Sequence, residues 1–88
     1  MNNDLATLRK KIDHIDAEIL ALLQERMQHS IRVGNIKKEN ELLVFDEVRE
    51  KELIQKLQKK AGKNLSPELI EAVWSTIMAE SRHLQEAR

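Results

Sequence analysis

The chain has 88 residues, of which 41% are hydrophobic and 34% charged, enough for one small folded domain over residues 1–88. Its 15 Lys and Arg residues balance 15 Asp and Glu residues, which argues against a nucleic-acid or anionic-membrane surface, because either needs a basic excess. The absence of cysteine excludes disulfides and thiolate metal sites. We expect a cytoplasmic protein, since the sequence shows neither a secretory signal nor an apolar run of the roughly 20 residues that a membrane-spanning helix needs.

Glycine, proline and aromatic residues are scarce in this chain. Two glycines, one proline and 2% aromatic residues supply too few turn and strand formers for a β-sandwich or barrel. The chain is rich instead in Leu, Ile, Ala, Glu, Lys, Arg and Gln, which lose the least free energy on entering a helix. The composition therefore predicts an all-α fold.

The first predicted helix runs from about Leu5 to about Lys38, with Asn3 or Asp4 as its N-cap. About 34 residues at a rise of 1.5 Å give roughly 50 Å of helix, which is longer than a compact domain of this size is across. Its apolar residues recur at intervals of three and four and form one continuous stripe, consisting of Leu5, Leu8, Ile12, Ile15, Ile19 and Leu22.

Two shorter helices are predicted after a loop at residues 39–45. Asp46 caps the second helix, which has about 16 residues and ends near Gly62. Ser66-Pro67 opens the third, of about 20 residues, because serine is a favoured N-cap and proline a favoured first helical residue. The expected core residues of these helices are Leu53, Ile54, Leu57, Ile70, Val73, Trp74, Ile77, Met78 and Leu84.

A single copy of this chain encloses a thin core. One tryptophan and one phenylalanine are the only aromatic residues, and a chain this short buries a small share of its surface. Two copies packed long helix against long helix would cover more apolar surface. We therefore expect an intertwined homodimer of helical bundles, each copy with one long and two shorter helices.

Charged residues interrupt the apolar stripe of the first helix. Continued in its own rhythm, the stripe reaches positions 26, 29, 33 and 36, where Val33 and Ile36 are apolar but Arg26 and His29 are not. An arginine on an apolar face is costly unless it meets an anion. Arg26 therefore lies near an end of the bundle, pairs with a buried glutamate, or binds an anionic ligand.

The shorter helices also carry polar residues on their apolar faces. Asp46 and Glu50 extend the face of the second helix, and the helix dipole explains Asp46 but not the neighbouring Arg49. Ser81 and Gln85 extend the face of the third helix. The hydrogen-bond donors near the predicted core side are Arg26, Lys37, Arg49, Ser81 and Gln85. This set favours a small, doubly anionic ligand held inside a helical bundle.

Other chemistries find little support in the sequence. His14, His29 and His83 lie far apart and lack the carboxylate spacing of a zinc or di-iron site, and His14 and His83 are expected on the surface. No glycine-rich loop is present to hold a phosphate. The serines lack a histidine and an acid in a catalytic arrangement.

Three stretches of the sequence resemble the all-helical class of chorismate mutases, in order and over nearly the whole chain. The first covers Leu5-x-x-Leu8-Arg9-x-x-Ile12-Asp13-x-Ile15-Asp16, Leu22-Leu23-x-x-Arg26 and Val33-Gly34-x-x-Lys37. The second is Asp46-Glu47-Val48-Arg49-Glu50-Lys51-Glu52, and the third is Glu80-Ser81 with Gln85. Members of this class are intertwined helical dimers, some fused to a prephenate dehydratase or dehydrogenase, and 88 residues leave no room for such a second domain.

The resemblance implies the conversion of chorismate to prephenate, an intramolecular pericyclic rearrangement that needs no cofactor, metal or nucleophile. By similarity, Arg26 and Arg9 would hold the two substrate carboxylates, with Arg9 reaching over from the partner subunit. Lys37 and Gln85 would face the ether oxygen, which gains negative charge as its bond breaks. The resemblance thus assigns catalysis to Arg26, Lys37 and Gln85.

The remaining residues implied by the resemblance bind substrate. Asp46, through its backbone, and Glu50 would contact the ring hydroxyl, and Ser81 would contact a carboxylate. Arg49 would line the pocket and orient Glu50. Two alternatives stay open: an isochorismate-pyruvate lyase of the same fold, and a helical dimerisation module without activity, which would leave residues such as Arg26 unexplained.

Overall fold

The computed structural model describes residues 2–86, with side chains from residue 4 onward. Over this range it contains no strand and consists of three helices, α1 (Asn2–Glu39), α2 (Glu47–Lys60) and α3 (Pro67–Glu86). Their lengths are 38, 14 and 20 residues. The prediction of an all-α fold with one long and two shorter helices is confirmed.

The first helix begins earlier than expected. Because α1 starts at Asn2, Asn3 and Asp4 lie within its first turn, and the prediction that one of them is the N-cap is wrong. Asp4 still places a negative charge at the positive end of the helix dipole. The helix continues to Glu39, and Glu41 then adopts a φ of 57°, in the left-handed region that reverses the chain direction.

Both predicted caps of the shorter helices are present. The Asp46 carboxylate accepts a hydrogen bond of 3.0 Å from the backbone N–H of Arg49 at the start of α2. The Ser66 hydroxyl accepts one of 3.1 Å from Leu69 N–H at the start of α3. Side-chain oxygens thus satisfy backbone donors that have no partner inside the helix.

The end of α2 differs from the prediction. The helix stops at Lys60, and Ala61 is the C-cap. Ala61 still donates its N–H to the Leu57 carbonyl oxygen, but its φ of −65° and ψ of 140° are those of extended backbone. No glycine has a positive φ, so Gly62 does not end the helix as a left-handed residue. The helix therefore ends close to Gly62, as predicted, but through an extended residue and not through a left-handed glycine.

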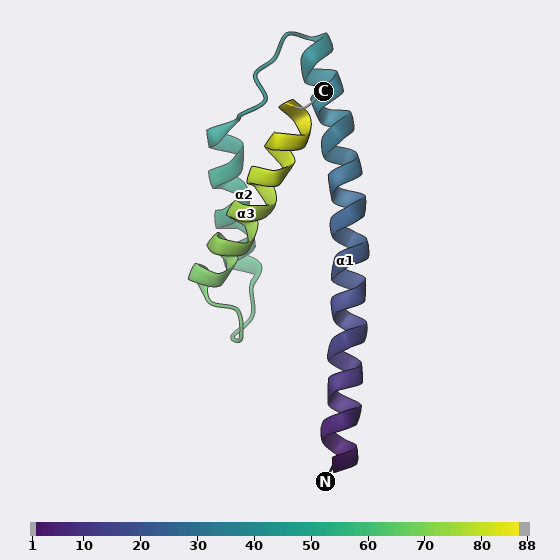
Figure 1. The fold of residues 1–88 in the computed structure, drawn as a ribbon. Helices are drawn as coiled ribbons and strands as arrows, with labels where there is room; N and C mark the ends of the chain where they lie inside the picture. Colours follow the sequence, from purple (N-terminus) through teal and green to yellow (C-terminus); the bar gives the residue numbers. More distant parts are fainter. Residues whose placement is uncertain (1, 87–88) are drawn as a thin grey trace.

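The two shorter helices lie beside the C-terminal half of α1 (Figure 1). The chain turns back after α1, descends through α2 and returns through α3, which packs against both α1 and α2. The N-terminal half of α1 extends away from the other helices, and the molecule measures 59 × 25 × 15 Å. None of the described helices is both long enough and apolar enough to cross a membrane.

The core of this chain is as thin as its composition implies. Among the described residues, only Ile70 and Met78 are buried hydrophobic side chains, and both belong to α3. Of the other expected core residues, Val73 is exposed, and the rest are partly buried, namely Leu53, Ile54, Leu57, Trp74, Ile77 and Leu84. Much of the predicted apolar surface therefore has no partner within one chain.

The apolar stripe of α1 is exposed along its length. The six stripe residues from Leu5 to Leu22 have 48–62% of their surface accessible, and Ile36 is exposed as well. The buried residues of α1 are instead Ser30 and Gly34, which lie one residue, or about 100°, further round the helix than stripe positions 29 and 33. The helix therefore has two different faces: one packs against α3, and the other is apolar and uncovered.

Candidate active site

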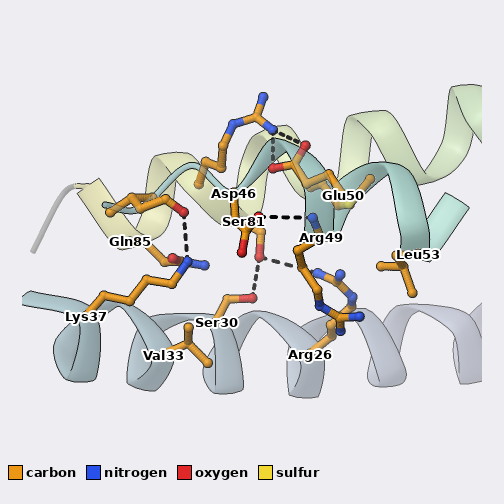
Figure 2. Close-up of a pocket in the computed structure, with 13 residues that line it drawn as sticks. Arg26, Ser30, Val33, Lys37, Asp46, Arg49, Glu50, Leu53, Ser81 and Gln85 are labelled. Atoms are coloured by element: carbon orange, nitrogen blue, oxygen red, sulfur yellow. Dashed lines mark hydrogen bonds and ion pairs between the residues drawn. The ribbon is translucent and has the colours of Figure 1, made fainter. Parts of the chain in front are cut away.

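A cavity of about 360 Å³ lies between the C-terminal half of α1, the start of α2 and the last turns of α3 (Figure 2). All three helices contribute polar side chains to its wall. It brings together seven of the eight residues that the sequence predicted for the site: Arg26, Lys37, Asp46, Arg49, Glu50, Ser81 and Gln85. Each helix also contributes one apolar side chain to the lining, namely Val33, Leu53 and Met78.

The eighth predicted residue, Arg9, does not reach this cavity. It lies on the exposed N-terminal half of α1, roughly five turns before Arg26, which is about 25 Å of helix. One chain therefore does not bring Arg9 to the other predicted residues.

Two serines and an arginine form the floor of the cavity. Arg26 donates a hydrogen bond of 3.3 Å from Nη1 to the Ser81 hydroxyl, and the hydroxyls of Ser30 and Ser81 are also hydrogen-bonded to each other. Ser30 and Ser81 are buried, with 8% and 6% of their surface accessible. The sequence prediction missed Ser30, although it lies one turn after Arg26 on the same face of the helix.

Lys37 ties the loop to α1. Its ammonium donates a hydrogen bond of 2.8 Å to the Val44 carbonyl oxygen, near the end of the loop. A lysine has three donors, so this contact fixes the ammonium beside the cavity and leaves donors for a ligand. The loop in turn delivers Asp46, whose carboxylate is engaged in capping α2. The cap uses Oδ1 alone, and the Asp46 carbonyl oxygen accepts from Glu50 N–H at 3.1 Å, so Oδ2 and the backbone N–H of Asp46 remain for a ligand.

Glu50 is held by a residue that the sequence prediction missed. Arg82 donates from Nη1 to both carboxylate oxygens of Glu50, at 2.5 and 2.6 Å. The Arg82 guanidinium also lies over the Phe45 ring, 4.8 Å from its centroid. In this structure the cation against the Glu50 carboxylate is Arg82, and a role of Arg49 in orienting Glu50 stays a prediction. No sequence signal marks Arg82, because its partners lie on α2 and in the loop before α2.

Gln85 lies where α3 comes closest to α1. A Cβ built on Gly34 would be 2.9 Å from Cα, Cβ and Cγ of Gln85, a separation that real side chains do not adopt. Gly34 therefore permits the close approach of the two helices. The Oε1 atom of Gln85 is buried and finds no hydrogen-bond partner among the described residues. This amide oxygen is thus available to accept a hydrogen bond from a ligand in the cavity.

The cavity carries an excess of positive charge. No ion pair among the described residues involves Arg26, Lys37 or Arg49, whereas Glu50 is paired with Arg82. Burial, and to a smaller extent the positive charge of Arg49, lower the pKa of Arg26 below its usual value. Partly buried like charges repel each other, and an anion bound between them offsets this repulsion by its attraction to both. The arrangement therefore favours a small anion with more than one negative group.

The alternative explanations for the charged residues fit the structure less well. Arg26 does not pair with a glutamate in the described part of the chain but with the hydroxyl of Ser81. His14 and His83 are exposed as expected, and His14 pairs with Glu18 at 2.8 Å on the surface of α1. His29 is exposed too and lies 3.9 Å from Glu25.

Three curated relatives are similar to this chain. A bifunctional chorismate mutase/prephenate dehydratase of Aquifex aeolicus (strain VF5) is 44% identical over 54 residues, which is 61% of this chain. The protein of the same description from Buchnera aphidicola subsp. Acyrthosiphon pisum (strain APS) is 37% identical over 81 residues, or 91% of the chain. The T-protein of Enterobacter agglomerans is 33% identical over 79 residues, or 89%.

These relatives are much longer than the present chain. The matched regions span 15% of the Aquifex protein and 21% of each of the other two. The sequence profile of one family, described as chorismate mutase type II, matches residues 8–86 and so includes all three helices and every residue that lines the cavity. The chain therefore belongs to the chorismate mutase type II family.

Proposed function

We propose that this protein is a chorismate mutase, an isomerase that converts chorismate to prephenate. The observation that carries the proposal is the cavity itself, in which Arg26, Lys37 and Arg49 have no anionic partner among the described side chains. Chorismate is a small dianion, and its rearrangement is intramolecular. A protein accelerates such a reaction by holding the reactive conformer and by placing positive charge where negative charge develops.

In this proposal Arg26 binds one substrate carboxylate. Its guanidinium is positioned by the hydrogen bond to Ser81, and Ser81 itself offers a hydroxyl to a carboxylate. A guanidinium matches the planar geometry of a carboxylate and keeps its charge when partly buried. Arg49 lines the same wall and adds a second positive charge.

Lys37 and Gln85 face the ether oxygen. Both line the cavity, where the Val44 carbonyl oxygen holds the Lys37 ammonium and the side-chain amide of Gln85 carries two N–H donors. As the ether bond breaks, its oxygen gains negative charge, and donors that are already in place stabilise this charge without reorganisation. Their contribution is therefore larger in the transition state than in the ground state.

The ring hydroxyl is bound at the start of α2. Glu50 supplies a carboxylate that accepts its hydrogen bond, and Asp46, which also lines the cavity, contributes through its backbone. This places the hydroxyl of the substrate against the start of α2.

A homodimer completes the site in this proposal. The exposed apolar stripe of α1 and its uncovered N-terminal half support packing against a second copy, in which the long helices intertwine. Arg9 of one copy then reaches the cavity of the other and binds the second carboxylate. The single domain over residues 1–88 and the cytoplasmic location also remain predictions.

The test is product analysis. Purified protein is incubated with chorismate and, separately, with isochorismate, and the products are identified by chromatography. Prephenate from chorismate, at a rate well above that in buffer, supports the proposal. Pyruvate and salicylate from isochorismate, without prephenate from chorismate, would identify a lyase instead. No reaction with either substrate would leave a helical module without activity.

A further inference from the structure

Arg82 joins three parts of the cavity wall. It belongs to α3, its Nη1 donates to both oxygens of Glu50 on α2, and its guanidinium lies over the ring of Phe45 at the end of the loop. We propose that Arg82 is a positioning residue that holds the Glu50 carboxylate in the orientation that accepts the ring hydroxyl of the substrate. This inference rests on the proposed function, because it concerns the role of Glu50 in substrate binding.

The geometry of the pair leaves Glu50 able to bind a ligand. A carboxylate has about four acceptor positions, and one nitrogen of Arg82 occupies one on each oxygen. The remaining lone pairs are open to a hydroxyl in the cavity that Glu50 lines. Without Arg82, the flexible glutamate side chain is free to take other rotamers.

Phe45 fixes the other side of Arg82. A guanidinium over an aromatic face is held by cation–π attraction, so its position is set from two directions. The same loop carries Val44, which holds Lys37, and Asp46, which caps α2. Arg82 therefore locks the segment that delivers several proposed substrate contacts.

A purely stabilising role explains the pair less well. The side chains of Arg82 and Glu50 are 30% and 21% accessible, so water still screens part of their attraction, and both line the cavity. The ion pair instead fixes the orientation of the Glu50 carboxylate, because charge-assisted contacts to both of its oxygens restrict its rotation.

The test compares kcat and KM for chorismate in wild type, Arg82→Met, Glu50→Gln and the double variant. Methionine keeps an apolar stem and removes the guanidinium. Because the ring hydroxyl is present in both ground state and transition state, a poorly placed acceptor weakens both. Arg82→Met should raise KM about tenfold with little change in kcat. In the Glu50→Gln background, Arg82→Met should change KM by less than about twofold.

Lys63→Met removes one positive charge from the exposed α2–α3 loop and should behave as wild type. If Arg82→Met does not fold by circular dichroism, Arg82→Lys gives the same comparison with a milder change, since it keeps the positive charge but loses the planar guanidinium that lies over Phe45. An unchanged KM, a fall in kcat alone, or an equal effect with and without Glu50 would overturn the inference. Wild-type protein that does not convert chorismate would overturn the proposed function, and this inference with it.

Discussion

At the scale of single residues, Gln85 is the most informative side chain in the cavity. Its Oε1 atom is buried and has no hydrogen-bond partner among the described residues, and α1 approaches the side chain so closely that only glycine fits at position 34. An unpaired buried amide oxygen is costly, so a ligand that donates a hydrogen bond to it recovers part of that cost. Gln85 and Gly34 each lead to a prediction.

Gln85→Ala should lower kcat on the order of a hundredfold and change KM much less, because the lost donor acts on charge that develops in the transition state. Gln85→Glu is a sharper variant. An ionised carboxylate repels the developing charge, whereas a protonated one still donates, so activity should be low at neutral pH and rise as pH falls. Steady-state kinetics from pH 4 to 8 measure this. A Gln85→Glu profile that matches wild type would show that the side chain does not face the reacting oxygen.

Gly34→Ala should disturb the contact between α1 and α3. The added Cβ would lie 2.9 Å from three carbon atoms of Gln85, so the helices must separate. Overpacking of this kind costs about 1–3 kcal/mol, and kcat should fall because Gln85 moves. Gly62→Ala is the matched control, since nothing lies within 4 Å of its Cβ position and its φ is not positive. Thermal unfolding and kinetics that are the same for both variants would contradict the close approach.

At the scale of elements, the capped N-termini of α2 and α3 differ in their distance from the cavity. Asp46 caps α2 at the cavity, and Ser66 caps α3 at the opposite end of that helix from Gln85. Loss of either cap removes a partner from a backbone donor and costs about 1 kcal/mol. Only the start of α2, however, lines the cavity.

Asp46→Ala should therefore lower both stability and kcat/KM, whereas Ser66→Ala should lower stability alone. Asp46→Asn keeps the capping oxygen and should retain kcat/KM within about threefold of wild type, because the proposed contact is made by the backbone. Chemical denaturation and kinetics measure the two quantities separately. An inactive Asp46→Asn variant with an intact α2 would mean that the carboxylate itself takes part.

The sequence predicts these helices well because their signals are local. Asp46, Ser66 and Pro67 act within one turn of chain, so their position alone identifies two helix starts. The end of α2 is less predictable from local signals, because Ala61, an extended residue, ends the helix just before Gly62. The periodicity of α1 correctly predicts a helix with one apolar stripe. It does not predict which helix packs against that stripe.

The cavity was predictable only in part. Arg26 and Ser81 stand out because they interrupt apolar faces, and the structure brings them into contact. Ser30 and Arg82 carry no such signal, since their partners belong to other helices and depend on how α3 lies against α1 and α2. The resemblance assigns Arg49 to Glu50, whereas the packing of α3 brings Arg82 against the Glu50 carboxylate.

At the scale of the whole molecule, one chain looks incomplete. The N-terminal half of α1 stands apart, and its apolar stripe is about half exposed (Figure 1). Exposed apolar surface of this extent indicates an interaction site. A second copy related by two-fold symmetry would cover this stripe with its own. The homodimer remains the proposal that connects Arg9 to the cavity.

Mixing Arg9→Ala with Arg26→Ala subunits tests this shared site. Each variant alone should be nearly inactive, whereas a hybrid dimer holds one site with both arginines. Because half of randomly paired dimers are hybrids with one of two sites intact, about a quarter of wild-type activity should return. Light scattering provides the control for assembly. Exchange of subunits without recovered activity, or a stable folded monomer of 10.3 kDa, would contradict the shared site.

The central claim is that the cavity beside Arg26 converts chorismate, and the fall in chorismate absorbance on addition of protein tests it most directly. Wild type should consume chorismate far faster than buffer does. Arg26→Met should lose at least about a hundredfold of that rate, because a charged contact to the substrate is removed from a partly buried site. Wild-type protein with no effect on chorismate, or an Arg26→Met variant as active as wild type, would contradict this account.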